Sequence, residues 1–128
     1  MALSAYHGNT AVQLRPCTVV TADTTSTAVN VAKYEGIAMA LLTAGAGTSD
    51  TDASRSAVVT LYDADTTSDT FATTGYVFTT RVTTAGVEGI MVDLANCKTF
   101  LKVVTDVTGT NISYAGIGVT LIAPGSGR

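Results

Sequence analysis

Short apolar segments alternate with clusters of Gly, Asp, Thr and Ser along the chain, and this punctuation restricts the fold more than any other feature. Apolar runs of this length bounded by turn-forming residues are typical of β-strands, because Asp, Ser and Gly stabilise tight turns. We predict eight strands, at residues 12–22, 28–32, 36–43, 57–62, 76–83, 89–94, 100–107 and 114–122. Eight short strands with polar turns predict an all-β fold, a two-sheet β-sandwich or jelly roll.

The composition agrees with a β fold in one domain. The chain has 128 residues, of which 13% are charged and 46% are hydrophobic, with 12 Gly and only 2 Pro. Lys and Glu, which favour helices, are scarce, whereas Thr and Val, which favour strands, are abundant. A chain of this length forms a single core. We therefore expect one β-sandwich domain over residues 15–128, preceded by an extended N-terminal arm over residues 1–14.

The predicted strands differ in which faces they bury. In segments 77–82 and 116–121 polar and apolar residues alternate, as in a strand with one buried face. The run 37–42 (IAMALL) is apolar on both faces, which indicates either the interior of the sandwich or a contact between subunits. The polar segments 45–56 and 63–74 are expected to be exposed loops, with Phe71 of the second folded back onto the edge of the sandwich.

Charge and hydropathy exclude several classes of partner. The formal net charge is −3 and the basic residues are scattered, whereas binding to nucleic acid through its phosphates needs clustered cations. The longest apolar run, at 37–42, is far shorter than the about 20 residues that span a membrane. The first residues lack the basic and apolar regions of a secretory signal. We expect no nucleic-acid partner, no membrane partner and synthesis in a cytoplasm.

No set of residues predicts an enzyme. His7 is the single histidine, and nothing in the sequence nominates a nucleophile and an orienting carboxylate to accompany it. Cys17 and Cys97 belong to no C-x-x-C motif and to no Cys/His cluster, so we expect two buried thiols rather than a disulfide or a zinc site. We predict no catalytic residue and no cofactor.

Five aspartates in two polar segments are the candidate ligands for a metal ion. They are Asp63, Asp65 and Asp69, together with Asp50 and Asp52. Loops rich in carboxylates bind calcium, but the EF-hand pattern requires Gly and Glu where this chain has Ser68 and Thr74. Asp is also an ordinary residue of polar turns. We interpret the five aspartates as turn residues and predict no metal site.

Six segments between residues 28 and 124 have an order and spacing shared with a known family. They are 34–41 (YEGIAMAL), the Gly-rich loop 45–48, the strand and acidic hairpin 59–65 (VTLYDAD) with Phe71 as its apolar anchor, 92–94, 100–103, and the closing strand 118–122 (GVTLI). In this order they resemble the decoration, or cement, proteins of tailed bacteriophages, which are encoded beside the major capsid protein. The resemblance rests on strand and turn patterns and includes no catalytic motif.

The resemblance implies a structural protein of the virion. Such a protein is made in the host cytoplasm, lies on the capsid exterior, binds the major capsid protein and itself, often as a homotrimer, and stabilises the shell without enzymatic activity or a cofactor. The low charge of the chain agrees, because subunit interfaces are depleted in charged residues at their cores. For contacts with the capsid or with neighbouring subunits we predict Leu3, Tyr6, Val12 and Leu14 of the arm, together with the loop at 45–56.

Two other functions share parts of this pattern. Another virion component, such as a tail-tube, head-completion or fibre subunit, has the same β-rich and weakly charged composition. A carbohydrate-binding or adhesion module on a jelly roll is the second alternative. It requires a group of solvent-facing aromatic side chains, for which Tyr6, Tyr34 and Tyr76 are the candidates.

Overall fold

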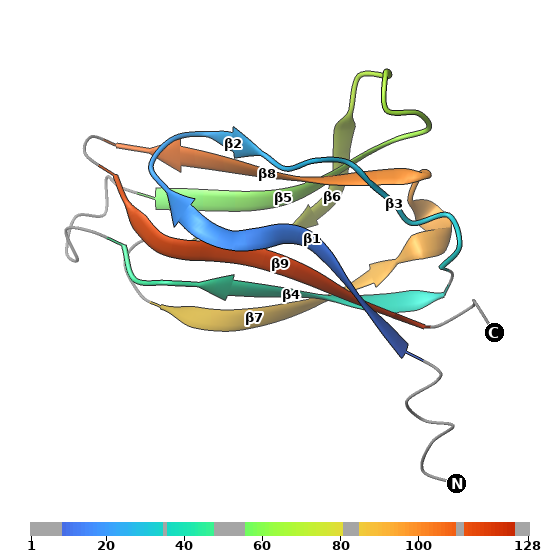
Figure 1. The fold of residues 1–128 in the computed structure, drawn as a ribbon, viewed down its shortest axis with the longest axis horizontal. Helices are drawn as coiled ribbons and strands as arrows, with labels where there is room; N and C mark the ends of the chain where they lie inside the picture. Colours follow the sequence, from blue (N-terminus) through green and yellow to red (C-terminus); the bar gives the residue numbers. More distant parts are fainter. Residues whose placement is uncertain (1–8, 35, 48–55, 81–84, 110–111, 125–128) are drawn as a thin grey trace, which may run out of the picture.

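Two antiparallel β-sheets lie face to face in the computed structural model of the chain (Figure 1). The structure describes residues 9–34, 36–47, 56–80, 85–109 and 112–124. Its strands are β1 (Asn9–Val20), β2 (Thr24–Thr25), β3 (Val29–Asn30), β4 (Ile37–Ala44), β5 (Ser56–Ala64), β6 (Ala72–Val77), β7 (Gly86–Asp93), β8 (Phe100–Thr108) and β9 (Tyr114–Pro124), with a short 3-10 helix η1 (Leu94–Asn96) between β7 and β8. The predicted all-β sandwich is confirmed.

The strand order is that of a jelly roll. Sheet 1 has the order β1-β9-β4-β7, and sheet 2 has the order β2-β8-β5-β6. The short strands β2 and β3 pair with successive parts of β8 and so act as one interrupted edge strand. Only the connections β2–β3 and β5–β6 stay within a sheet, and every other connection crosses to the opposite sheet. Two four-stranded layers joined in this way form the double Greek key of the jelly roll.

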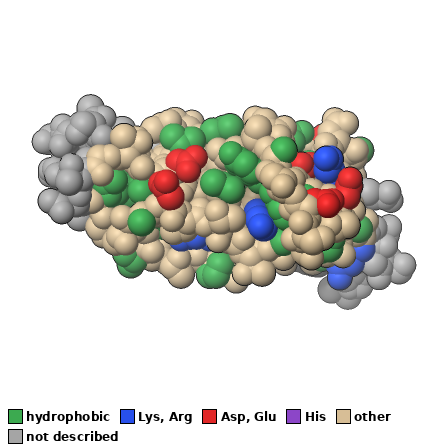
Figure 2. Space-filling model, turned by 90° about the horizontal axis from the view of Figure 1, so that it is seen from above, with side chains coloured by type: hydrophobic (Ala, Val, Ile, Leu, Met, Phe, Trp, Pro, Cys, Tyr) green, Lys and Arg blue, Asp and Glu red, His purple; other side chains and the backbone are tan. Residues whose placement is uncertain are grey.

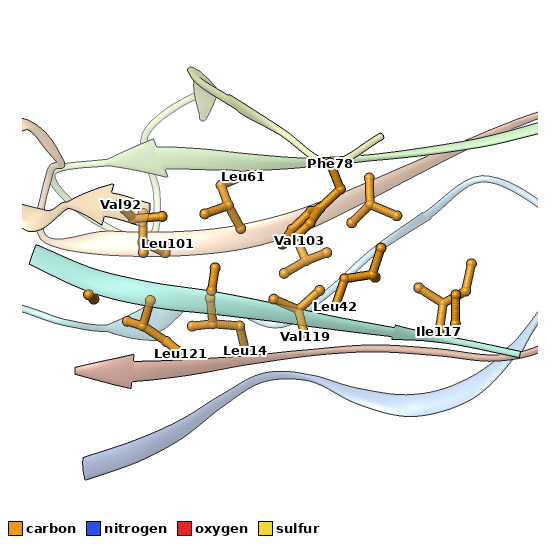
Figure 3. Packing of buried hydrophobic residues seen from close by; sticks show 14 of the residues in the cluster. Leu14, Leu42, Leu61, Phe78, Val92, Leu101, Val103, Ile117, Val119 and Leu121 are labelled. Carbon is orange, nitrogen blue, oxygen red and sulfur yellow. The ribbon is translucent and has the colours of Figure 1, made fainter. Parts of the chain in front are cut away.

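The core fills the space between the sheets with aliphatic side chains from alternate positions of the central strands. Val59 and Leu61 of β5 and Val119 and Leu121 of β9 are fully buried. Figure 3 shows these layers meeting, with Leu42 and Ile117 from sheet 1 opposite Val103 and Phe78 on the side of sheet 2. Period-two burial of this kind is what the alternating sequence of the strands predicts.

The segment predicted as a strand at 76–83 is placed differently. Strand β6 covers Ala72–Val77, and Phe78 follows it as a buried core residue outside any strand. Gly75 has a positive φ of 89°, and the Thr74 hydroxyl donates a hydrogen bond to the Leu61 carbonyl, so the strand is irregular where the alternating pattern begins. The prediction was wrong in position, because the strand ends at Val77 and residues 78–80 turn one Phe inward without forming a strand. Residues 81–83 lie outside the described residues.

The second predicted loop is shorter than expected, because β5 extends to Ala64 and β6 starts at Ala72. Phe71 folds back as predicted: the Lys102 Nζ lies 4.0 Å from the centroid of its ring, on the outer side of β8. A cation over an aromatic ring at this distance is a favourable contact. Phe71 is therefore half-buried at the edge of the sandwich.

The segment expected to be an arm joins the sandwich before residue 15. Residues 9–14 form the first half of β1 and pair with β9, from Asn9 opposite Pro124 to Gln13 opposite Thr120. The sandwich therefore begins at or before Asn9, and residues 1–8 lie outside the described residues. In the described part of the chain no helix is long and apolar enough to cross a membrane.

Candidate interaction surface

Of the four residues predicted to make contacts, the structure describes Val12 and Leu14. Leu14 is only 2% exposed and belongs to the core, and Val12, which pairs with the buried Leu121, packs against that core. The Leu14 side chain is therefore not available to a partner, and Val12 is half-buried, because β1 pairs with β9 instead of extending freely. Leu3 and Tyr6 lie outside the described residues, as does most of the predicted contact loop, at 48–55.

The outer face of sheet 1 carries a continuous group of exposed apolar side chains. On β4, Ile37 is 52% exposed and Met39 is 39% exposed, and on β7 the values are 57% for Met91 and 69% for Val87. Met39 lies directly opposite Met91 on one side and Ile122 on the other. Ala11 lies opposite Ile122, so one row of apolar residues crosses all four strands. Contiguous exposed apolar patches on folded proteins usually mark contact sites.

This face also lacks charge. Among the described residues that point outward from sheet 1, the central strands β4 and β9 contribute no charged side chain. Asp93 stands at one end of β7, where its carboxylate accepts hydrogen bonds from the Ala95 N–H and the Asn96 amide of η1. The Asp93 carboxylate therefore lies at the border of the patch and is hydrogen-bonded to groups of the same chain. A partner that binds the patch would make apolar contacts and would find few charged side chains there.

Sheet 2 has a different outer face. Lys102 lies opposite Tyr62 on it, and Asp106 lies opposite Val58. Figure 2 views the molecule from the side on which β2, β8 and β5 lie in Figure 1, and shows Lys or Arg and Asp or Glu side chains distributed among the hydrophobic ones. The two faces of the sandwich therefore differ in chemistry, because charged side chains lie among the hydrophobic ones on sheet 2.

The outer face of sheet 1 has a hollow of about 430 Å³ at one end. Met39 and Met91 lie toward the opposite end of the same strands. The lining of the hollow is mostly apolar and consists of Cys17, Thr43, Ala44, Gly45, Gly86, Val87, Ala115 and Gly116. Two glycines of its lining allow neighbouring strands to approach closely. A Cβ atom built on Gly45 would lie 2.8 Å from the Gly116 nitrogen, and one built on Gly116 would lie 2.9 Å from the Cys17 Sγ.

Arg15 fastens the irregular part of β1 that borders this hollow. The register with β9 shifts on either side of Arg15, and Pro16 stands in the irregular stretch, as it does in edge strands and bulges. The guanidinium donates to the Ile117 carbonyl and to the hydroxyls of Thr24 and Thr18, each at 3.0 Å. Burial lowers the pKa of Arg15. These three bonds tie β1, β9 and β2 together, which is a structural role.

The two cysteines differ from the prediction of two buried thiols. Both are free, but Cys17 is exposed and Cys97 is half-buried. Cys17 faces outward because the shifts in register around Arg15 and Thr18 break the alternation of β1. Burial, together with the nearby charges of Asp63 and Asp93, raises the pKa of the Cys97 thiol to about 11. Cys97 is therefore a weak nucleophile at neutral pH.

The aspartates predicted as turn residues do not come together. Asp63 is buried, and its carboxylate accepts a hydrogen bond from the Lys98 N–H, whereas Asp65 and Asp69 are exposed in the turn after β5. Asp50, Asp52 and His7 lie outside the described residues. Within the described ranges no three His, Cys, Asp or Glu side chains are grouped so as to hold a metal ion.

The aromatic group required for a carbohydrate site is not formed by the two candidates that the structure describes. Tyr34 and Tyr76 are half-buried and both pack against the core. The Tyr76 hydroxyl accepts a hydrogen bond from the Asp93 N–H, which links β6 of one sheet to β7 of the other. These rings serve packing between the sheets, and Tyr6 lies outside the described residues.

A scan against protein-family models found no match to the chain, and a search of the curated proteins found none with a matching sequence.

Proposed function

We propose that this chain is a capsid decoration protein, which binds the outside of a bacteriophage capsid as an oligomer and stabilises the shell. The observation that carries the proposal is the outer face of sheet 1, where exposed methionine and aliphatic side chains form an almost uncharged patch. Such a face is protected from water when protein covers it. An assembly protein, whose surface is used against other subunits, accounts for that surface and for the low charge of the chain.

The fold and the rest of the surface are compatible with this role. Jelly rolls occur in viral capsid proteins, lectins and cupins, so the fold alone does not choose among them. A lectin is less well supported, because Tyr34 and Tyr76 are engaged in packing. A cupin-like metal enzyme is less well supported, because the described residues hold no cluster of metal ligands. The apolar face and the sequence resemblance both favour assembly.

Stabilisation of a shell by such a protein follows from mass action. A protein that binds the assembled shell and not its dissociated or unfolded subunits lowers the free energy of the shell by the free energy of binding. A capsid offers many equivalent sites, so small contributions add. Neither an enzymatic step nor a cofactor is needed.

The number of copies of this chain in each purified virion tests the proposal. Quantitative mass spectrometry should give hundreds of copies, in a fixed ratio to the major capsid protein. A few copies, or a few dozen, would assign the chain to the tail, the head completion complex or the fibres. Absence from particles would refute a role in the virion, and a glycan-binding screen would then test the adhesion alternative.

The predicted contribution of the N-terminal segment needs a deletion that spares the sandwich. Because β1 begins at Asn9, removal of residues 1–8 deletes Leu3 and Tyr6 but leaves the pairing with β9 intact. If these residues contact the capsid, the truncated chain should bind purified shells more weakly while its melting temperature stays unchanged. Equal binding by the truncated and full-length chains would contradict the predicted contact.

A further inference from the structure

The two ends of the outer face of sheet 1 differ, because exposed apolar side chains gather at one end and a hollow lies at the other. Ile37, Met39 and Met91 stand together near the start of β4 and the end of β7, and we call these three residues the ridge. The glycine-rich hollow of about 430 Å³ lies at the opposite end of the same two strands, beside Thr43 and Val87. One surface thus contains both an apolar projection and an apolar recess.

The spacing of these two features suits a two-fold contact. Met39 and Ala44, which mark the ridge and the hollow on β4, are five positions apart, or about 17 Å along a strand. A two-fold axis that lies in the plane of contact and crosses the strands near Leu41 would place the ridge of each copy over the hollow of the other. Contacts related by a two-fold axis are the commonest in oligomers, and they require a surface that is complementary to itself.

The area and the charge of the face also agree with a second copy as its partner. Four strands at about 4.8 Å spacing and eight residues at about 3.4 Å give about 500 Å² for each copy. The pair would bury about 1,000 Å² in total, which is the lower limit for a specific interface. A face with almost no charge needs a partner without charge, and an identical face meets that requirement.

We propose that two copies of this chain pack sheet 1 against sheet 1, with the ridge of each copy in the hollow of the other. Sheets packed in this way lie about 10 Å apart, and the inward-facing residues of both interdigitate. The contact goes beyond the proposed function, because it assigns this face to a second copy, and a capsid would then be bound through other surfaces of the pair. It also differs from the homotrimer that the family resemblance implies, since a trimer uses a three-fold contact.

The mass of the purified chain in solution, measured by light scattering during size-exclusion chromatography, tests the pair. The expected mass is twice the chain mass of 13.0 kDa. Met91→Glu places a charge on the ridge and should reduce the mass to that of one chain. Val77→Glu is the matched control, because Val77 is 47% exposed on β6 of the other sheet, and this variant should keep the mass of the pair.

A second variant tests the hollow without adding charge. Val87→Trp fills the hollow and should also give single chains, while circular dichroism spectra and melting curves show that both variants are folded. When the Met91→Glu and Val87→Trp chains are mixed, a mixed pair retains one intact ridge and one intact hollow that face each other. The mixture should therefore contain more pairs than either variant alone.

Three results would overturn the inference. They are a wild-type chain with the mass of one chain, a trimer whose mass is the same with Met91→Glu, and a mixture that forms no more pairs than its components. A higher oligomer that Met91→Glu divides into halves would support it. None of these measurements uses capsids, so the inference can fail while the copy number in virions still supports the proposed function.

Discussion

One hydroxyl group in the core leads to a direct prediction about the free energy of unfolding. Thr105 is on β8, fully buried between the sheets, and its Oγ1 is the one buried side-chain polar atom of the described residues that has no hydrogen-bond partner. A buried hydroxyl without a partner has lost its hydrogen bonds to water and gained nothing in return. Thr105→Val keeps the shape of the side chain and replaces the hydroxyl with a methyl group.

The size of the effect follows from the burial. An unsatisfied buried polar group destabilises a fold by about 1–3 kcal/mol, so Thr105→Val should raise the free energy of unfolding by about 1–2 kcal/mol. Unfolding entropy is about 2.1 cal/mol/K per residue, which gives about 0.27 kcal/mol/K for a chain of 128 residues. The melting temperature should therefore rise by about 4–7 °C.

The same chemical change at Thr24 should act in the opposite direction. The Thr24 hydroxyl accepts a hydrogen bond from the buried Arg15 guanidinium, so Thr24→Val should lower the free energy of unfolding by about 1–2 kcal/mol. Both variants are compared with the wild-type chain by calorimetry at one protein concentration, because association would shift the melting temperature. A Thr105→Val variant that melts at or below the wild-type temperature would refute the reasoning, since it would mean that the hydroxyl has a partner.

Three further variants and one chemical treatment test individual contacts of the sandwich. Gly118→Ala should lower the melting temperature by several degrees, because its Cβ would lie 2.9 Å from the Cys17 backbone, whereas Gly75→Ser, with open space around it, tests backbone strain alone. With a thiol reagent at pH 8, Cys97 should react about 100-fold more slowly in the folded chain than in the unfolded chain, because a pKa of about 11 leaves about 0.1% of the thiol as thiolate. The rate of this reaction should rise about tenfold for each pH unit. A rate that does not change with pH would contradict the raised pKa of Cys97. Tyr76→Phe should cost about 1 kcal/mol in chemical denaturation by removing the acceptor of the Asp93 N–H, and an unchanged midpoint would show that this link between the sheets contributes little.

Local patterns in the sequence predicted most strands because each strand has its own alternation and its own flanking turns. The segments predicted at 36–43, 57–62, 100–107 and 114–122 all overlap observed strands, with ends that differ by up to two residues. The pairing of these strands was not predictable in the same way. Paired residues of β1 and β9 are 94 to 115 positions apart in the sequence, from Val20 with Tyr114 to Asn9 with Pro124, and nothing local specifies which edges meet.

The contact surface was predictable in part. The run 37–42 is apolar on both faces, and this pattern indicated a subunit contact as one of two readings; the structure buries Ala38, Ala40 and Leu42 and leaves Ile37 and Met39 exposed. The hollow was missed, because it depends on glycines of different strands meeting at one end of the sheet. The role of Arg15 was also missed, and Pro16 within a predicted strand was its one local signal, since proline in a strand marks an edge or a bulge.

The position of β9 affects the time at which this protein can fold during synthesis. β9 is the last described strand, yet it lies in the middle of sheet 1, where it is the partner of both β1 and β4. Until residue 124 has left the ribosome, β1 has no strand to pair with in its own sheet and one edge of β4 stays open. Native pairs that are distant in sequence form slowly, and unpaired strands associate with other chains. Sheet 1 therefore cannot be completed before β9 has been made, and nascent chains held close together, as on a polysome, are most prone to pair wrongly with one another.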